Sequence, residues 1–383
     1  MKNNNEKQKK KTIGTFGAAS FLNDVGSDMI SPIWPLFVIN FLGAPLTILG
    51  LLDGLGESTV SLSKAGAGYF SDRIKKRKAF IWLGYLFASL SRLGYAISNT
   101  WPHLIPFRIL DRAGKIRDAP RDAIVADIST KKELGRNFGF INALDNLGAV
   151  LGITLSIFLF GVLGYKNLFL LASIPSVIAV LLILFNVKEK HNKSKLHKGI
   201  TFKDISSNLK LLFILSTVFA IGAFSYSFLL IYANKFGFAV TTIPILYLIF
   251  TAVASLTTFQ FGKLSDKIGR KKVLMLSFAL WSIVCLSFII FQSFFTIILA
   301  FVIYGLHKGS IDPVQKSFVS ELAKKKFRAS TLGGFQMLIG LAALPASLAA
   351  GILADKIHIF APFYLSLGLT LISLLLLMFV KEK

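Results

Sequence analysis

Arg108–Asp127, with the sequence RILDRAGKIRDAPRDAIVAD, is the stretch that decides how this chain is interpreted. It carries five basic and four acidic side chains, although apolar residues flank it and run through it. No turn signal interrupts it before Pro120, so the sequence predicts a charged helix. Ionisable side chains at membrane depth are energetically costly, and they indicate a functional site by default. We therefore expect the rest of the chain to hold this helix beside a solute.

The composition is that of a membrane protein. Hydrophobic residues make up 54% of the 383 residues and charged residues only 16%, whereas soluble proteins have about 25% charged residues. Twelve apolar stretches of roughly 20 residues are each long enough to cross about 30 Å of hydrocarbon. They lie near 12–42, 46–70, 79–99, 102–126, 135–162, 166–187, 209–234, 242–263, 273–292, 295–320, 329–353 and 358–380. The sequence therefore predicts an all-α membrane protein with twelve transmembrane helices.

The basic residues indicate how these helices are oriented. Of the 43 Lys and Arg residues, 31 lie at the two termini and in every second loop, which follows the positive-inside rule and places both termini in the cytoplasm. A net charge of +24 suggests nucleic acid in a soluble protein, but a basic rim beside a membrane meets anionic headgroups instead. We expect a multi-pass protein of the cytoplasmic (inner) membrane that contacts lipids and no nucleic acid.

The predicted spans contain nine acidic and nine basic side chains, so their charges cancel. An environment that penalises unpaired charge favours this balance. Only Lys308, Asp312 and Lys316 of these eighteen follow residue 150. We therefore expect the first half to carry the coupling chemistry. The second half then supplies an apolar wall, with Tyr226, Tyr232 and Gln336 as polar contacts.

An internal repeat divides the chain into two halves. The segment GYFSDRIKKRK at 68–78 returns as GKLSDKIGRKK at 262–272, and the same offset relates Asp127 to Glu321. One offset that aligns separate places indicates duplication. The sequence predicts a six-helix half at 1–187, a basic cytoplasmic linker at 188–208 and a second six-helix half at 209–383. Halves of equal orientation are related by a pseudo-twofold axis along the membrane normal.

These residues resemble the major facilitator superfamily over essentially the full length of the chain. The loop signature between helices 2 and 3 of that family is similar to Gly68, Asp72, Arg73 and Arg77, and its echo contains Gly262, Asp266 and Arg270. The resemblance implies that Asp72 holds the outward-open state. Asp127 and Glu321 are expected to pair with Arg73 and Lys267 at the cytoplasmic helix ends.

The charged stretch resembles a bacterial subgroup of the same family. That subgroup has the pattern DRxGK followed by PRDA, which here covers Asp111–Lys115 and Pro120–Ala123 without the extra Gly expected after Lys115. The resemblance implies a monomer in which helices 1, 4, 7 and 10 line a cavity. The candidate residues for binding solute and protons are Asp24, Asp28, Arg108, Asp111, Arg112, Lys115, Asp118 and Asp145.

Two further groups of residues are interpreted as structural. Asp53 and Glu57 are expected to form an ion-pair lock with Arg92 on the next helix. Gly50 with Gly54, and Gly148 with Gly152, have the GxxxG spacing that lets helices pack closely.

We expect a transporter rather than an enzyme, with no cofactor and no metal. The chain has no GxxxxGK[ST] loop, no HExxH motif and a single cysteine, Cys285. Our hypothesis is a secondary active transporter that moves a small polar or charged solute by alternating access, with protons coupled through Asp24, Asp28, Asp111 and Asp118. The alternative is an antiporter that exchanges hydrophobic drugs for protons, and a remote alternative is a membrane sensor or lipid-handling protein.

Overall fold

The computed structural model describes residues 2–74, 76–130, 133–187, 206–291, 293–324 and 328–382, with only the backbone at 2–5, 69, 72 and 329. Within these ranges the regular elements are helices, and none is a strand. The predicted all-α class is thus confirmed. The chain packs as two units, of which unit 1 comprises residues 1–43 and 59–197 and unit 2 comprises residues 44–58 and 198–383. The predicted boundary at 188–208 stays a prediction, since most of it lies outside the described ranges.

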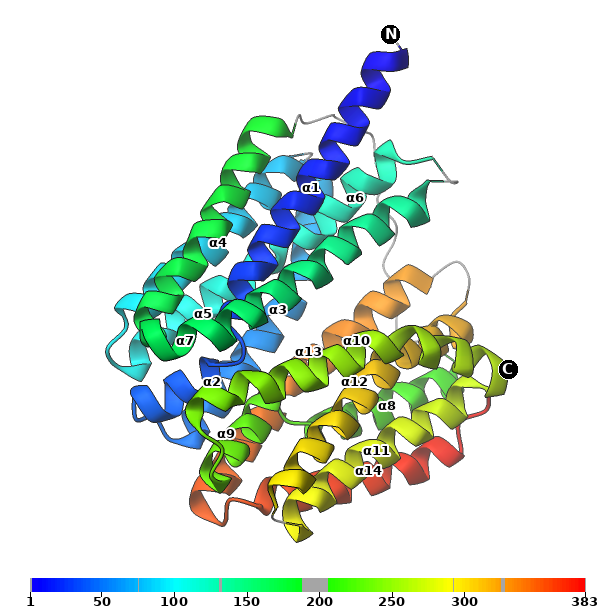
Figure 1. Cartoon of the computed structure of the whole chain (residues 1–383). Coiled ribbons are helices and arrows are strands. Elements are labelled where there is room, and N and C mark those ends of the chain that lie inside the picture. Colours follow the sequence, from blue (N-terminus) through cyan, green and yellow to red (C-terminus); the bar gives the residue numbers. More distant parts are fainter. Residues whose placement is uncertain are drawn as a thin grey trace. The chain divides into compact units, whose positions relative to one another are not determined.

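Unit 1 is built from seven α-helices among the described residues, one of which it shares with unit 2 (Figure 1). These are α1 (Lys2–Ile30), α2 (Trp34–Leu36), α3 (Leu46–Ile74), α4 (Arg77–Ile97), α5 (Leu104–Ala113), α6 (Asp118–Ile128) and α7 (Leu134–Asn186). A π-helical turn, η1 (Phe37–Phe41), and two 3₁₀ turns, η2 (Trp101–His103) and η3 (Gly114–Arg117), complete it. The core gathers Phe16, Ile81, Tyr85, Val125 and Ile183, each at most 1% exposed.

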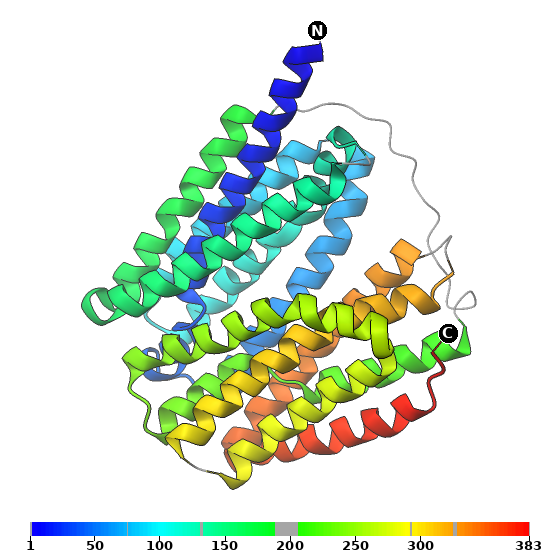
Figure 2. The same ribbon diagram turned by 45° about the vertical axis from the view of Figure 1, so that its right-hand side comes forward.

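Unit 2 contains the remaining helices and the first thirteen residues of α3. Its helices are α8 (Ser207–Gly222), α9 (Tyr226–Phe236), α10 (Ile243–Ile268), α11 (Arg270–Ile290), α12 (Phe294–Leu322), α13 (Arg328–Lys356) and α14 (Ala361–Met378), with the 3₁₀ turn η5 (Val240–Thr242) before α10. Helix α11 packs against both α12 and α14, which the two views show side by side (Figures 1 and 2). Buried aromatic rings also join α8 to α11, where Phe219 is stacked on Phe278 with 4.1 Å between the ring centres.

Eight helical segments of the described chain are long and apolar enough to cross a membrane. The predicted twelve crossings therefore stay a prediction. The difference has a physical reason, because α1, α3 and the α5–α6 stretch carry charged side chains along their length. In addition, α7 is 53 residues long and includes both predicted spans 135–162 and 166–187. Gly164 breaks it, with a φ of 66° that favours glycine.

The two predicted GxxxG pairs lie at close helix contacts. A Cβ atom built on Gly148 would lie 2.5 Å from the Phe21 carbonyl oxygen, and one on Gly152 would lie 2.4 Å from that of Val25. These glycines let α7 approach the α1 backbone. A Cβ on Gly50 would lie 2.0 Å from the Ser347 carbonyl oxygen, so α3 meets α13 equally closely within unit 2. The sequence pattern thus predicted both contacts.

Candidate functional site

The charged stretch is not the continuous α-helix that the sequence predicted. Helix α5 ends at Ala113, Gly114–Arg117 winds into the 3₁₀ turn η3, and α6 begins at Asp118. Pro120 lacks the N–H that would bond to the carbonyl of Ile116, which loosens the α-helical ladder here. Gly114 also lies against Gly84 of α4, since a Cβ on Gly84 would be 2.5 Å from the Gly114 carbonyl oxygen. A 3₁₀ turn inside a helix often marks a functional hinge.

Arg117 and Arg121 anchor this turn inside unit 1. Arg117 is only 4% exposed, donates to the Gly114 carbonyl at 2.8 Å and places its guanidinium 4.8 Å from the centre of the Tyr85 ring. Arg121 donates from Nη1 to the Ser20 Oγ at 2.7 Å, and that oxygen is 3.2 Å from the Tyr85 hydroxyl. These arginines tie α6 to α1 and α4. They were absent from the predicted site, although their i, i+4 spacing was visible in the sequence.

Asp145 lies beside Arg121 and is incompletely paired. Its Oδ2 is 3.9 Å from the Arg121 Nη1, and its Oδ1 is buried without a hydrogen bond among the described residues. The more exposed Asp122 takes the other side of the same guanidinium, with Oδ1 3.0 Å from Nε. Asp24 contributes a further carboxylate that acts electrostatically on Asp145 and accepts a hydrogen bond from Asn23 at 3.0 Å. The structure thus brings two predicted site carboxylates, Asp24 and Asp145, together.

Asp118 and Asp111 are paired more fully. Asp118 Oδ2 lies 3.1 Å from the Lys64 Nζ of α3, and its Oδ1 lies 3.8 Å from the Arg117 Nε. Asp111 Oδ2 is 3.5 Å from the Arg112 Nε, and Ser91 donates to its Oδ1 at 3.4 Å. Both carboxylates therefore serve to hold α5 and α6 against their neighbours.

Among the predicted cations, Lys115 and Arg108 differ in their surroundings. Arg108 is 5% exposed and stacks over Trp34, with 4.2 Å from its guanidinium carbon to the ring centre. Lys115 is half-buried and makes no ion pair within 4 Å in the part of unit 1 that is described. It acts electrostatically on Asp118 and Asp145. Lys115 is thus the cation of this stretch that remains available to a solute.

The predicted lock between α3 and Arg92 is wrong in its partners. The Arg92 guanidinium is buried and donates to the backbone carbonyls of Ala172 and Asn23, at 3.2 and 3.0 Å. The carboxylates that act on it are Asp111, Asp24 and Asp28. Asp53 accepts a hydrogen bond from Ser225 at 2.7 Å within unit 2. Helix α3 belongs to both units, and the sequence alone did not reveal this.

Unit 2 holds a charged cluster that the prediction of an apolar wall underrated. Lys308 lies midway along α12 and interacts electrostatically with Tyr304, Asp312 and Glu57. Glu57 and Asp312 are exposed, and neither makes an ion pair within 4 Å among the described residues. Asp312 also stands one repeat offset after Asp118. Charged side chains on a spanning helix face water or protein rather than lipid, so this cluster is a second place where a solute could be held.

The helix ends at the basic loops carry ion pairs, but with partners other than those predicted. Asp127 pairs with Arg77 at 2.6 Å, where Arg73 was expected. Glu321 pairs with Arg270 at 3.3 Å, where Lys267 was expected, and Arg270 also reaches Asp266 at 2.7 Å.

The first of the two repeated basic loops is described only in part. Gly68 and Gly262 lie in α3 and α10, and a Cβ on Gly68 would meet only Ala119 at 3.7 Å. The side chain of Asp72 lies outside the described residues, so its latch role stays a prediction.

Comparison with known proteins identifies the family. A profile described as Major Facilitator Superfamily matches residues 16–254 and 211–383. The chain belongs to the Major Facilitator Superfamily. It is 38% identical to an uncharacterised MFS-type transporter of Methanocaldococcus jannaschii, over 99% of this chain and 97% of the relative. It is therefore a multi-pass membrane transporter and not an enzyme.

More distant relatives of this Major Facilitator Superfamily chain have named activities. Multidrug resistance protein 2 of Bacillus subtilis is 26% identical over 95% of this chain and 93% of the relative. Quinolone resistance protein NorA of Staphylococcus aureus is 25% identical over 94% of each chain. Among solved structures, the nucleoside transporter NupG (D323A mutant) shares the fold, with a TM-score of 0.81 at 15% identity, covering 97% of this chain and all of that chain.

Proposed function

We propose that this chain is a secondary active transporter of the cytoplasmic membrane, working as a monomer by alternating access and coupled to protons. The observation that carries the proposal is Asp145, a carboxylate in a spanning helix whose Oδ2 lies 3.9 Å from Arg121 and whose Oδ1 is buried without a hydrogen bond among the described residues. Ionisable groups in such places mark proton and solute pathways. Arg121 beside it can stabilise the charged form, while loss of that contact favours protonation.

Coupling is assigned to Asp145 and Asp24 rather than to the fully paired acids. Asp118 has two basic partners within 4 Å, and both oxygens of Asp111 are engaged, by Arg112 and by Ser91. Asp24 supplies a second carboxylate that acts electrostatically on Asp145. Asp145 therefore joins Asp24 as the centre of the proposed relay.

The proposed solute is small and polar, with at least one charge. Lys115 in unit 1 is a cation without an ion-pair partner among the described residues, and it suits an anionic group. Glu57 and Asp312 in unit 2 are exposed carboxylates near Lys308, and they suit a cationic group. We also propose that the chain belongs to the bacterial subgroup of the family that carries the DRxGK and PRDA patterns.

The test is solute-driven proton movement in proteoliposomes. Purified protein is reconstituted with an internal pH indicator, and anionic, cationic and zwitterionic solutes are added in turn. We expect one charged class to move protons, and Asp145→Asn to abolish the pH signal while downhill solute uptake persists. Proton movement that survives replacement of both Asp24 and Asp145 by Asn would refute the assignment of coupling.

The alternative function is exchange of hydrophobic drugs for protons. It is favoured by relatives named for multidrug and quinolone resistance that span nearly the whole chain. A thermal-stability screen distinguishes the two proposals, because this alternative requires lipophilic cations to raise the unfolding temperature. Stabilisation by polar, charged solutes alone would exclude it.

A further inference from the structure

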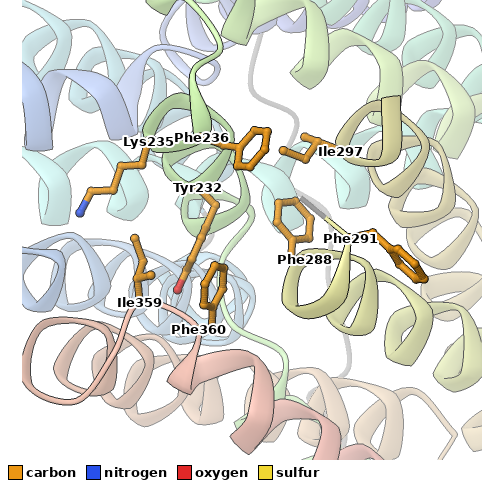
Figure 3. A pocket seen from close by; sticks show the side chains of 8 residues that line it. All are labelled: Tyr232, Lys235, Phe236, Phe288, Phe291, Ile297, Ile359 and Phe360. Carbon is orange, nitrogen blue, oxygen red and sulfur yellow. The ribbon is translucent and has the colours of Figure 1, made fainter. Parts of the chain in front are cut away.

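Unit 2 contains a cavity of about 220 Å³ at the end of α9 and α11, near the start of α12 and the loop before α14. Figure 3 shows the side chains that surround it. Its apolar wall is formed by Phe236, Phe288, Phe291, Ile297, Ile359 and Phe360. No acidic side chain lines it. A cavity with this lining suits a hydrocarbon group and not the charged solute proposed above.

Exposed apolar side chains adjoin this cavity. Phe291 belongs to the wall and is 59% exposed, and Phe294 and Phe295 beyond it are 54% and 76% exposed. A patch of large exposed apolar side chains on a membrane protein suits contact with hydrocarbon. A lipid chain can therefore approach the cavity from this surface.

Two polar side chains at this cavity have unused hydrogen-bonding or ionic capacity among the described residues. The Tyr232 side chain is only 4% exposed, and its hydroxyl has no hydrogen bond among the described residues. In Figure 3 this hydroxyl ends between Ile359 and Phe360. Lys235, one helical turn later on α9, is exposed and makes no ion pair in the described chain. Figure 3 shows its ammonium extended away from the aromatic rings.

We propose that this cavity binds an anionic phospholipid, with part of one acyl chain between the aromatic rings and the phosphate at Lys235. An apolar wall beside an unpaired cation matches an amphiphile with a negative head. The lysine stem can lie along apolar surface while its ammonium reaches the headgroup layer. This site is separate from the proposed solute sites and does not depend on them.

Lipid binding to purified, full-length protein tests the proposal without any transport measurement. The protein is delipidated in neutral detergent and titrated with dioleoyl phosphatidylglycerol. Dioleoyl phosphatidylcholine, which has no net charge, is the comparison lipid. Retained lipid is counted by native mass spectrometry, and the unfolding temperature is followed in parallel. We expect one tightly retained phosphatidylglycerol, with binding about fivefold weaker in Lys235→Ala, the effect of removing one basic residue near an anionic headgroup. Lys235→Arg should retain it.

Matched variants keep the test interpretable. Lys166→Ala removes a half-buried lysine that donates to Asn99 in unit 1, and it should leave the lipid count unchanged. Phe291→Ser changes an exposed part of the wall, and it should weaken both lipids because it acts on the acyl chain. Equal binding of phosphatidylglycerol by the protein and Lys235→Ala would overturn the proposal. Stabilisation by inorganic phosphate or free oleate equal to that by the phospholipid would also overturn it.

Discussion

The carboxylate of Asp355, near the end of α13, caps the first turn of α3 through Thr47. Thr47 donates to Asp355 Oδ2 from its backbone nitrogen and from its hydroxyl, both at 2.7 Å, and the Leu46 nitrogen donates to Oδ1 at 3.1 Å. The free N–H groups and positive dipole of a helix start favour such a carboxylate. This cap joins the α3 segment of unit 2 to α13, beside the close contacts of Gly50 and Gly54.

Replacement of this cap is predicted to lower stability and to loosen the start of α3. Asp355→Ala should cost about 1 kcal/mol of unfolding free energy, the usual cost of losing an N-terminal cap. Thr47→Val should cost less, because it removes the hydroxyl but leaves the backbone donors. Thermal unfolding in detergent and labelling of a cysteine placed at Leu46 measure the two effects. Unchanged unfolding and labelling in Asp355→Ala would contradict this account of the cap.

Asp145 and Asp122 flank the same guanidinium and provide a matched pair for coupling. Asp145→Asn removes the half-paired carboxylate, so solute-driven proton uptake should be lost while counterflow of labelled solute continues. Asp122→Asn, whose side chain is 45% exposed, should retain both. Loss of proton uptake in both variants to the same extent would assign the effect to Arg121 rather than to Asp145.

Lys115 is predicted to recognise the solute. Lys115→Met should weaken binding of the transported solute about tenfold, which corresponds to about 1.4 kcal/mol. It should leave the unfolding temperature without solute nearly unchanged, because this ammonium has no ion-pair partner within 4 Å among the described residues. Solute-dependent thermal shifts give both quantities. Lys64→Met is the contrasting variant, since its loss removes the nearer of the two basic partners of Asp118 and should lower stability itself.

Gly84 and Gly114 are predicted to tolerate no side chain. Alanine at Gly84 would place its Cβ 2.5 Å from the Gly114 carbonyl oxygen, and alanine at Gly114 would lie 2.7 Å from that of Gly84. Forcing these backbones apart should cost about 1–3 kcal/mol and displace the 3₁₀ turn. Gly139→Ala, where nothing lies within 4 Å, should unfold like the unaltered protein. The measurement is the unfolding temperature and the yield of monodisperse protein.

Glu133, in the loop before α7, gives a prediction for pH. Its hydrogen bonds with Lys9 and Thr130 lower the pKa of its carboxyl to about 2. A carboxyl with a lowered folded-state pKa stabilises the protein above its unfolded pKa, near 4.5, and this contribution is lost as the pH falls towards 2. Glu133→Gln should therefore unfold at a lower temperature than the unaltered protein at pH 6, and the difference should shrink at pH 3. A difference that grows at pH 3 would contradict this sign.

The fold class and the close helix contacts could be predicted because they depend on local patterns. Apolar runs define helices, and GxxxG spacing predicted close helix packing at Gly148 and Gly152, which the structure shows against α1. The acids at the helix ends were also predicted, but their partners were not. Asp127 pairs with Arg77 rather than Arg73, because pairing depends on where each guanidinium reaches in three dimensions.

The site itself could be predicted only in part. A run of charges marked the Arg108–Asp127 stretch, yet the 3₁₀ turn required knowledge that Gly114 meets Gly84 across helices. The unit 2 cluster was underrated because Lys308 and Asp312 are few in number, and Glu57 precedes them by about 250 residues in the sequence. Their proximity arises from the start of α3 packing within unit 2.

Because α3 belongs to both units, cutting the chain between the units would separate contacts that α3 makes. Helix α3 begins within unit 2 and ends within unit 1. A fragment that stops after residue 197 would carry Gly50 and Gly54 without the α13 backbone that they touch, and the complementary fragment would present Gly351 and Asp355 to an empty groove. Each fragment thus lacks the partner backbone that closes the contact between α3 and α13.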